Sequence, residues 1–135
     1  MKIYFVRHGR TDSNNLKRMA GQRMDDELNS EGINQAHELA EAIDKDFDVI
    51  FSSSMKRALQ TARIISDRIN VPIIERKEMM ERDYGEISGE SWKEAGEKTG
   101  LDPFDLKRRE FELTYDYRPY GGESAEDVKK RILAF

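Results

Sequence analysis

The stretch KIYFVRHG, residues 2–9, leads from a short apolar run directly into two basic side chains and a glycine. β-Branched and aromatic residues fill residues 3–6, and the run is far shorter than an ordinary helix. An uninterrupted apolar run of this length is typical of a parallel strand that is covered on both faces. We therefore predict a buried parallel strand over residues 2–6, with Arg7 and His8 at its carboxyl end.

Strand and helix patterns alternate after this run. Asn29-Ser30 can cap a helix whose apolar residues recur up to Ile43, and a second helical pattern runs from Met55 to Ile69 and ends at Asn70. Further strands are expected at residues 48–52 (DVIFS) and 71–75 (VPIIE). This order predicts an α/β fold of three layers, in which a mostly parallel sheet with right-handed crossovers is flanked by helices on both faces.

Residues 79–122 interrupt the alternation, and we interpret them as a lid-like excursion within a single domain spanning residues 1–135. Short helices are expected at residues 91–99 and 102–112. The aromatic residues of the excursion either line a substrate pocket or form the excursion's own core. Ser124 and Asp127 have the spacing of a capping box, which predicts a helix over the last residues.

The composition favours a small anionic ligand. The net charge of −4 argues against nucleic-acid binding, whereas residues 7–23 hold five basic side chains against one acidic one. With no cysteine and only two histidines, the chain has no disulfide, no thiolate chemistry and no cysteine-ligated zinc, and we expect neither a metal nor a cofactor. The apolar run at residues 3–6 is too short for a signal peptide or a membrane span, so we expect a soluble cytoplasmic protein without a membrane partner.

Chemically useful side chains follow three successive expected strands. His8 and Arg7 follow the first, Arg57 follows the second, and Glu81 follows the third. Ligands of open α/β sheets bind outside the carboxyl ends of the strands, so these side chains are expected to converge. Taken singly, each has a simpler explanation, because a lone histidine usually packs or caps and a lone Arg57 or Glu81 usually lies at the surface. Their joint placement favours a site.

These residue types suit phosphoryl transfer. A neutral histidine can attack phosphorus, arginine forks match the phosphoryl oxygens, and a protonated carboxyl can give its proton to the leaving alkoxide. Gly9 is expected to let the backbone pass close to the phosphate. The other histidine, His37, lies inside the first expected helix, away from this edge.

The stretch RHGRTDSN, residues 7–14, resembles the R-H-G-x-T-x-x-N signature of the histidine phosphatase superfamily, whose fold is phosphoglycerate mutase-like. R-H-G alone is a weak signal, but the similarity continues in order through GQRMDDELNSEGINQA (21–36), SSSMKRALQTA (52–62), MERDYGEISG (80–89) and GGESAEDV (121–128). The resemblance implies that His8 is the phosphorylated nucleophile and Glu81 the proton donor. It also implies that Arg7 and Arg57 hold the phosphoryl oxygens, with Asn14 assisting.

Three functions follow from this resemblance. The leading one is a metal-independent phosphatase that hydrolyses small phosphomonoesters, because the excursion is short for a mutase lid and the stretch DYRP leading into GGES resembles the phosphatase branch. The basic run at residues 107–109 leaves phosphoglycerate mutase as the second alternative, since paired arginines suit a second anionic group. A non-catalytic phosphate-binding module is the third alternative. The expected partner is a small phosphorylated metabolite.

The chain departs from the family pattern at one point. Family members carry a second catalytic histidine in a His-Gly pair after a central strand, and nothing in the sequence matches it, since His37 lies in a different block. We therefore expect a C-terminally incomplete domain, with the later strands and the central one missing, unless another segment or chain completes the sheet.

We expect the 135 residues alone to be inactive or nearly so, because losing one donor to the transition state costs roughly 10²–10³ in rate. A phosphatase assay on a preparation whose intact mass matches 135 residues checks this expectation, and measurable turnover would refute it.

Overall fold

The computed structural model describes residues 2–106 and 114–135, and the chain divides into two compact units. The first unit comprises Met1–Asp12 and Asp26–Lys77, and the second comprises Ser13–Asp25 and Glu78–Phe135. Among the helices of the described ranges, none combines the length and the apolar character needed to cross a membrane.

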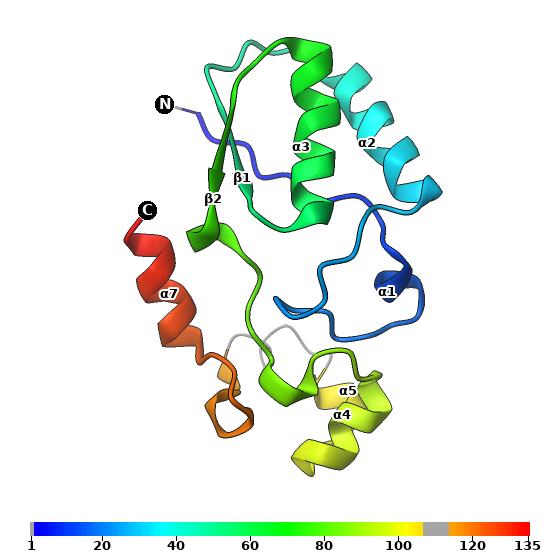
Figure 1. Ribbon diagram of the computed structural model, residues 1–135, viewed down its shortest axis with the longest axis vertical. Helices are drawn as coiled ribbons and strands as arrows, with labels where there is room; N and C mark the ends of the chain where they lie inside the picture. Colours follow the sequence, from blue (N-terminus) through cyan, green and yellow to red (C-terminus); the bar gives the residue numbers. More distant parts are fainter. Residues whose placement is uncertain (1, 107–113) are drawn as a thin grey trace. The chain divides into compact units, whose positions relative to one another are not determined.

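The first unit is built around two parallel strands joined by a helix. Strands β1 (Ile50–Ser53) and β2 (Ile73–Arg76) pair in parallel, with Ile50 opposite Ile73, and α3 (Lys56–Ile69) connects them. Helix α3 packs on both strands, and α2 (Ser30–Ala42) packs on α3 (Figure 1). The expected parallel sheet with flanking helices is confirmed in this strand–helix–strand unit, and each strand begins two residues later than predicted.

The ends of both helices lie where the sequence predicts them. The Asn29 side chain accepts a hydrogen bond from Gly32 N at 2.9 Å and caps α2. Helix α3 ends at Asn70, whose φ of 54° is left-handed and whose N–H donates to Ser66 O at 2.7 Å. Asparagine tolerates this conformation better than other residues with a side chain, because its short polar group hydrogen-bonds locally.

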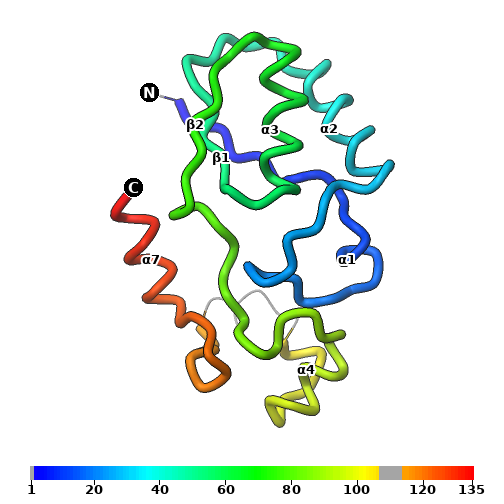
Figure 2. The backbone as a smooth tube through the Cα atoms, viewed as in Figure 1, coloured from blue at the N-terminus to red at the C-terminus, as the bar shows by residue number. Residues whose placement is uncertain are grey.

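The expected strand over residues 2–6 is wrong, because these residues form no strand in the structure. Their side chains are exposed rather than buried, with Ile3 at 61% and Phe5 at 93%. A strand requires a neighbour for its backbone N–H and C=O groups. In the described part of the chain β1 and β2 pair only with each other, so the run stays outside the sheet and follows an extended path (Figure 2).

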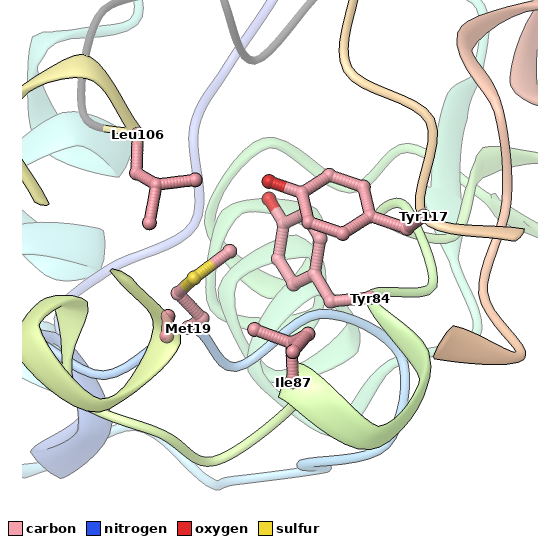
Figure 3. Close-up of a cluster of buried hydrophobic side chains, with 6 residues drawn as sticks. Met19, Tyr84, Ile87, Leu106 and Tyr117 are labelled. Carbon is pink, nitrogen blue, oxygen red and sulfur yellow. The ribbon is translucent and has the colours of Figure 1, made fainter. Parts of the chain in front are cut away.

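The second unit consists of short helices and turns around its own apolar core. Its core cluster contains Met19, Tyr84, Ile87, Ala95, Leu106 and Tyr117, all of them buried (Figure 3). The elements are α1 (Asp12–Asn15), η1 (Lys77–Met79), η2 (Gly85–Ile87), α4 (Trp92–Thr99), α5 (Pro103–Leu106), η3 (Arg118–Tyr120) and α7 (Ala125–Leu133), of which α1 and η1 begin with one residue of the first unit.

Aromatic side chains of the excursion take part in this core rather than standing apart from it. Tyr117 has no exposed surface and meets Tyr84 edge to face, with ring centroids 4.9 Å apart. Trp92, Tyr115 and Tyr120 pack against the cluster, whereas Phe104 is 73% exposed. Of the two interpretations that the sequence left open, the structure favours the core for these residues. Phe111 and most of the expected helix 102–112 lie outside the described residues, which contain only its first turn, α5.

Capping boxes begin the two longer helices of this unit. Ser124 Oγ accepts from Asp127 N at 3.1 Å while Asp127 Oδ2 accepts from Ser124 N at 2.9 Å, as the sequence predicts. Ser91 and Glu94 make the same reciprocal pair at α4. Hydrogen bonds from the Ser124 hydroxyl and backbone hold the pKa of Asp127 below its ordinary value, so the carboxylate stays charged at the positive end of α7.

Candidate active site

His8 lies in the irregular segment that precedes α1, and a backbone contact orients its ring. The side chain is half-buried, and Nδ1 lies 2.7 Å from the carbonyl oxygen of Gly9. A carbonyl can only accept a hydrogen bond, so Nδ1 must carry the proton. In the neutral ring the lone pair then resides on Nε2, which makes Nε2 the nucleophilic nitrogen of His8.

A chain of two hydrogen bonds connects the histidine segment to the start of α3. The Gly9 N–H donates to Thr61 Oγ1 at 3.1 Å, and the Thr61 hydroxyl donates to the carbonyl oxygen of Arg57 at 2.8 Å. Thr61 and Gly9 are both buried. Gly9, the residue next to His8, is thus attached to the turn of α3 that carries Arg57. The hydrogen bonds connect the segments that hold the two predicted site residues, His8 and Arg57.

Gly9 is required by a close backbone contact with α2. A Cβ atom on Gly9 would lie 2.3 Å from the oxygen of Gly32, and one on Gly32 would lie 2.1 Å from the oxygen of Arg10. Both distances are shorter than any real contact, and the obstructing atoms belong to the backbone, which cannot move aside. The structure thus gives Gly9 a packing reason that the sequence analysis did not foresee, while its expected role beside a phosphate stays a prediction.

Arg57 is a buried cation in the first turn of α3. Its side chain is 2% exposed, which is rare for arginine. The first turn contains Lys56 beside it and no acidic residue. The unbonded N–H groups and partial positive charge of a helix N-terminus also favour an anion. Position, charge and burial therefore suit Arg57 for holding an anionic group, and the second arginine, Arg7, is exposed in the preceding segment.

The remaining predicted residues belong to the second unit. Asn14 is half-buried on α1. Glu81 has an exposed side chain, and the Tyr84 hydroxyl donates to its Oε1 at 3.5 Å. Asn14 and Glu81 belong to the second unit and His8 and Arg57 to the first, so the meeting of the four residues stays a prediction. Within the described ranges, no three His, Asp or Glu side chains are grouped to hold a metal ion.

Thr61 is the residue of this region that the sequence analysis missed. It lies four residues after Arg57 and next to Ala62, on the side of α3 that the structure buries. A hydroxyl on such a face needs a partner, since an unsatisfied buried polar group is costly. The sequence signal for Thr61 is its helical spacing from Arg57 and Ile65, which places its hydroxyl on the buried side of the helix.

The sequence of residues 3–135 matches the profile of the histidine phosphatase superfamily (branch 1), and the chain belongs to this family. A relative from Parvibaculum lavamentivorans, named 2,3-bisphosphoglycerate-dependent phosphoglycerate mutase, is 34% identical over 98% of this chain and 64% of its own length. An uncharacterized phosphatase of Bacillus subtilis, PhoE, is 43% identical over 64% of this chain and 45% of its own. The chain thus spans slightly less than two thirds of the length of the first relative and less than half of the second.

Solved structures agree with this assignment. A mycobacterial glucosyl-3-phosphoglycerate phosphatase, solved with VO3, superposes with a TM-score of 0.77 at 30% sequence identity. The match covers 93% of this chain and 60% of the phosphatase chain. A protein named mycobacterial hydrolase 1 gives a TM-score of 0.77 at 28% identity, over 94% of this chain and 59% of its own. The predicted α/β histidine phosphatase fold is confirmed.

Replacing Thr61 by valine tests the connection between the histidine segment and α3. Thr61→Val keeps the shape of the side chain but leaves the buried Gly9 N–H without its acceptor, which we expect to lower the free energy of unfolding by about 1–3 kcal/mol. Thr61→Ser keeps the hydroxyl and loses one methyl group, at a cost of about 1 kcal/mol. Urea denaturation of both variants measures the difference, and equal losses would contradict the hydrogen-bond argument.

Proposed function

We propose that this chain carries the phosphate-accepting part of a phosphatase site, in which Nε2 of His8 attacks a small phosphomonoester and becomes phosphorylated. The observation that carries the proposal is the hydrogen bond from His8 Nδ1 to Gly9 O at 2.7 Å. It leaves the lone pair on Nε2 and holds the ring in one orientation, which a nucleophile needs before it meets phosphorus. Water then attacks the phosphohistidine and releases inorganic phosphate.

The arginines supply the positive charge of this mechanism. Charge builds up on three equatorial oxygens as the phosphoryl group transfers, and guanidinium forks stabilise it through paired hydrogen bonds. Arg57 is suited to this role because its charge is held in a site with little water, where electrostatic interactions are stronger than at the surface. Arg7 and Asn14 complete the oxygen-binding set, so no metal is required.

Glu81 is the proton donor of the proposal. An alkoxide is a poor leaving group, and a carboxylic acid within hydrogen-bond reach of the ester oxygen makes its departure easier. The Tyr84 hydroxyl approaches one Glu81 oxygen at 3.5 Å. The relative named as a phosphatase at 43% identity and the mycobacterial phosphatase structure support the hydrolytic reaction. The complete relatives are longer, so the activity proposed is that of the whole protein.

Trapping the intermediate tests the nucleophile. Incubation of the whole protein with a ³²P-labelled phosphomonoester, followed by rapid denaturation in alkali, is expected to leave a base-stable and acid-labile label on the protein. The label should disappear in His8→Asn and persist in His37→Asn, a matched control because His37 is the second of the two histidines and lies exposed on α2. A label that survives in His8→Asn contradicts the assignment. No label, with phosphate still bound, supports the non-catalytic alternative instead.

A phosphoglycerate mutase is the second candidate, favoured by the 34% identical relatives that bear this name. The two functions differ in the fate of the phosphoryl group, which a mutase returns to the substrate and a phosphatase gives to water. We expect incubation with 3-phosphoglycerate and, separately, with p-nitrophenyl phosphate to release free phosphate. If ³¹P NMR instead shows isomerised phosphoglycerate and no free phosphate, the mutase is favoured.

A further inference from the structure

A network of charged side chains holds the backbone on both sides of Glu81. Arg131, on α7, donates from Nη1 to the carbonyl oxygen of Glu78 at 2.6 Å and from Nη2 to that of Glu81 at 3.0 Å. The same guanidinium donates to Glu123 from Nε at 2.8 Å and from Nη2 at 3.1 Å. One arginine thus grips two carbonyl groups three residues apart and is itself held in place by a carboxylate.

Glu123 holds the other side of the same segment. Its Oε2 accepts from the backbone N–H of Asp83 at 2.9 Å, and its own N–H donates to the Asp83 carbonyl at 2.8 Å. The Glu123 carbonyl accepts from Arg82 Nε at 3.0 Å, and Gln22 donates to Oε2 at 3.1 Å. We call Arg131 and Glu123 together the clamp, and residues 78–83 the clamped segment.

The clamp matters because burial does not fix the Glu81 side chain. That side chain is exposed, and the hydroxyl of Tyr84 approaches its carboxyl only at 3.5 Å, the outer limit of a hydrogen bond. The carboxyl projects from the backbone of Glu81, so a shift of that backbone moves the carboxyl with it. The clamp engages the Glu81 carbonyl directly and the Asp83 amide two residues later, so it defines that backbone.

We propose that Arg131 and Glu123 are positioning residues for the reaction, which set where the Glu81 carboxyl delivers its proton to the leaving group. This inference rests on the proposed function, in which Glu81 is the proton donor. A general acid contributes about 10²–10⁴ in rate, and a misplacement of about 1 Å can remove much of it. Neither clamp residue contacts substrate in this account. Both act through the path of the backbone at residues 78–83.

The geometry of arginine is essential to this role. The clamp needs donors at three nitrogen atoms in fixed directions, which the planar guanidinium provides and the single ammonium of lysine does not. The pair is also sheltered, with side chains 19% and 21% exposed, so solvent weakens it less than a surface pair. Arg68 and Glu41 make a bidentate contact of the same kind at 2.9 and 3.3 Å in the first unit, but their side chains are 54% and 68% exposed.

The test compares leaving groups. In Arg131→Lys and Glu123→Gln, hydrolysis of an alkyl phosphate such as β-glycerol phosphate should fall about 10- to 100-fold, because the alkoxide needs the proton from Glu81. Hydrolysis of p-nitrophenyl phosphate should fall less than about threefold, because p-nitrophenolate leaves without a proton. Arg68→Lys, the matched control, should change neither rate. Circular dichroism of each variant checks that α7 remains folded.

Two results would overturn the positioning role. An equal fall for both substrates would mean that the clamp supports only the fold, and unchanged alkyl phosphate hydrolysis would mean that it does not place Glu81. Amide hydrogen exchange supplies a measurement that needs no turnover. Exchange in residues 79–83 should accelerate in Arg131→Lys and Glu123→Gln and stay unchanged in Arg68→Lys. Unaltered exchange in the clamp variants would also overturn the inference.

The same experiments separate this inference from the proposed function. If the unaltered protein forms a His8 label and hydrolyses both esters, the proposed function stands and the leaving-group ratio decides the clamp. If no label forms on His8 of the unaltered protein, the proposed function fails, and with it the proton-donor role of Glu81 that the clamp serves.

Discussion

The hydrogen bond from Gly9 N to the Thr61 hydroxyl is the contact on which the candidate site depends most directly. It is made between residues 52 positions apart in the sequence, in a buried setting where the loss of either partner leaves a polar group unsatisfied. This bond attaches the segment that holds His8 to α3. Because α3 packs on both strands, the attachment restricts the position of the histidine. A histidine on an irregular segment is thereby held by a regular element, as the proposed nucleophile requires.

The features that the sequence predicted well are those that depend on neighbours along the chain. Asn29, Asn70 and the Ser124–Asp127 pair mark helix ends because their side chains or backbone bond to groups within four residues. The strand expected at residues 2–6 depends instead on a partner far away in sequence, and its apolar pattern carries no information about whether that partner is present. The sequence pattern predicts which face a strand would bury. Whether the strand forms depends on backbone hydrogen bonds to a neighbouring strand.

The same difference between local and distant contacts applies to the candidate site. The residue types after the strands expected at residues 2–6 and 48–52, together with the family motif, predicted His8 and Arg57 as site residues, and the structure links the segments that hold them. Thr61 was missed because its value lies in a tertiary contact, and Glu123 and Arg131 were missed because they act on the backbone of another segment. A motif indicates which groups react. It says little about the groups that hold them still, which are spread over the chain and can be found only from contacts.

The exposed run at residues 3–6 has a consequence for handling the protein. Ile3, Tyr4, Phe5 and Val6 all have high β-propensity, carry no charge and form no strand in the structure. An uncharged, exposed segment of this kind is a template for edge-to-edge association between chains. Lys2 and Arg7 flank it, and such charges act as gatekeepers, because stacking chains in register would bring like charges together. High salt screens these two cations, so it is expected to favour association of chains through this run.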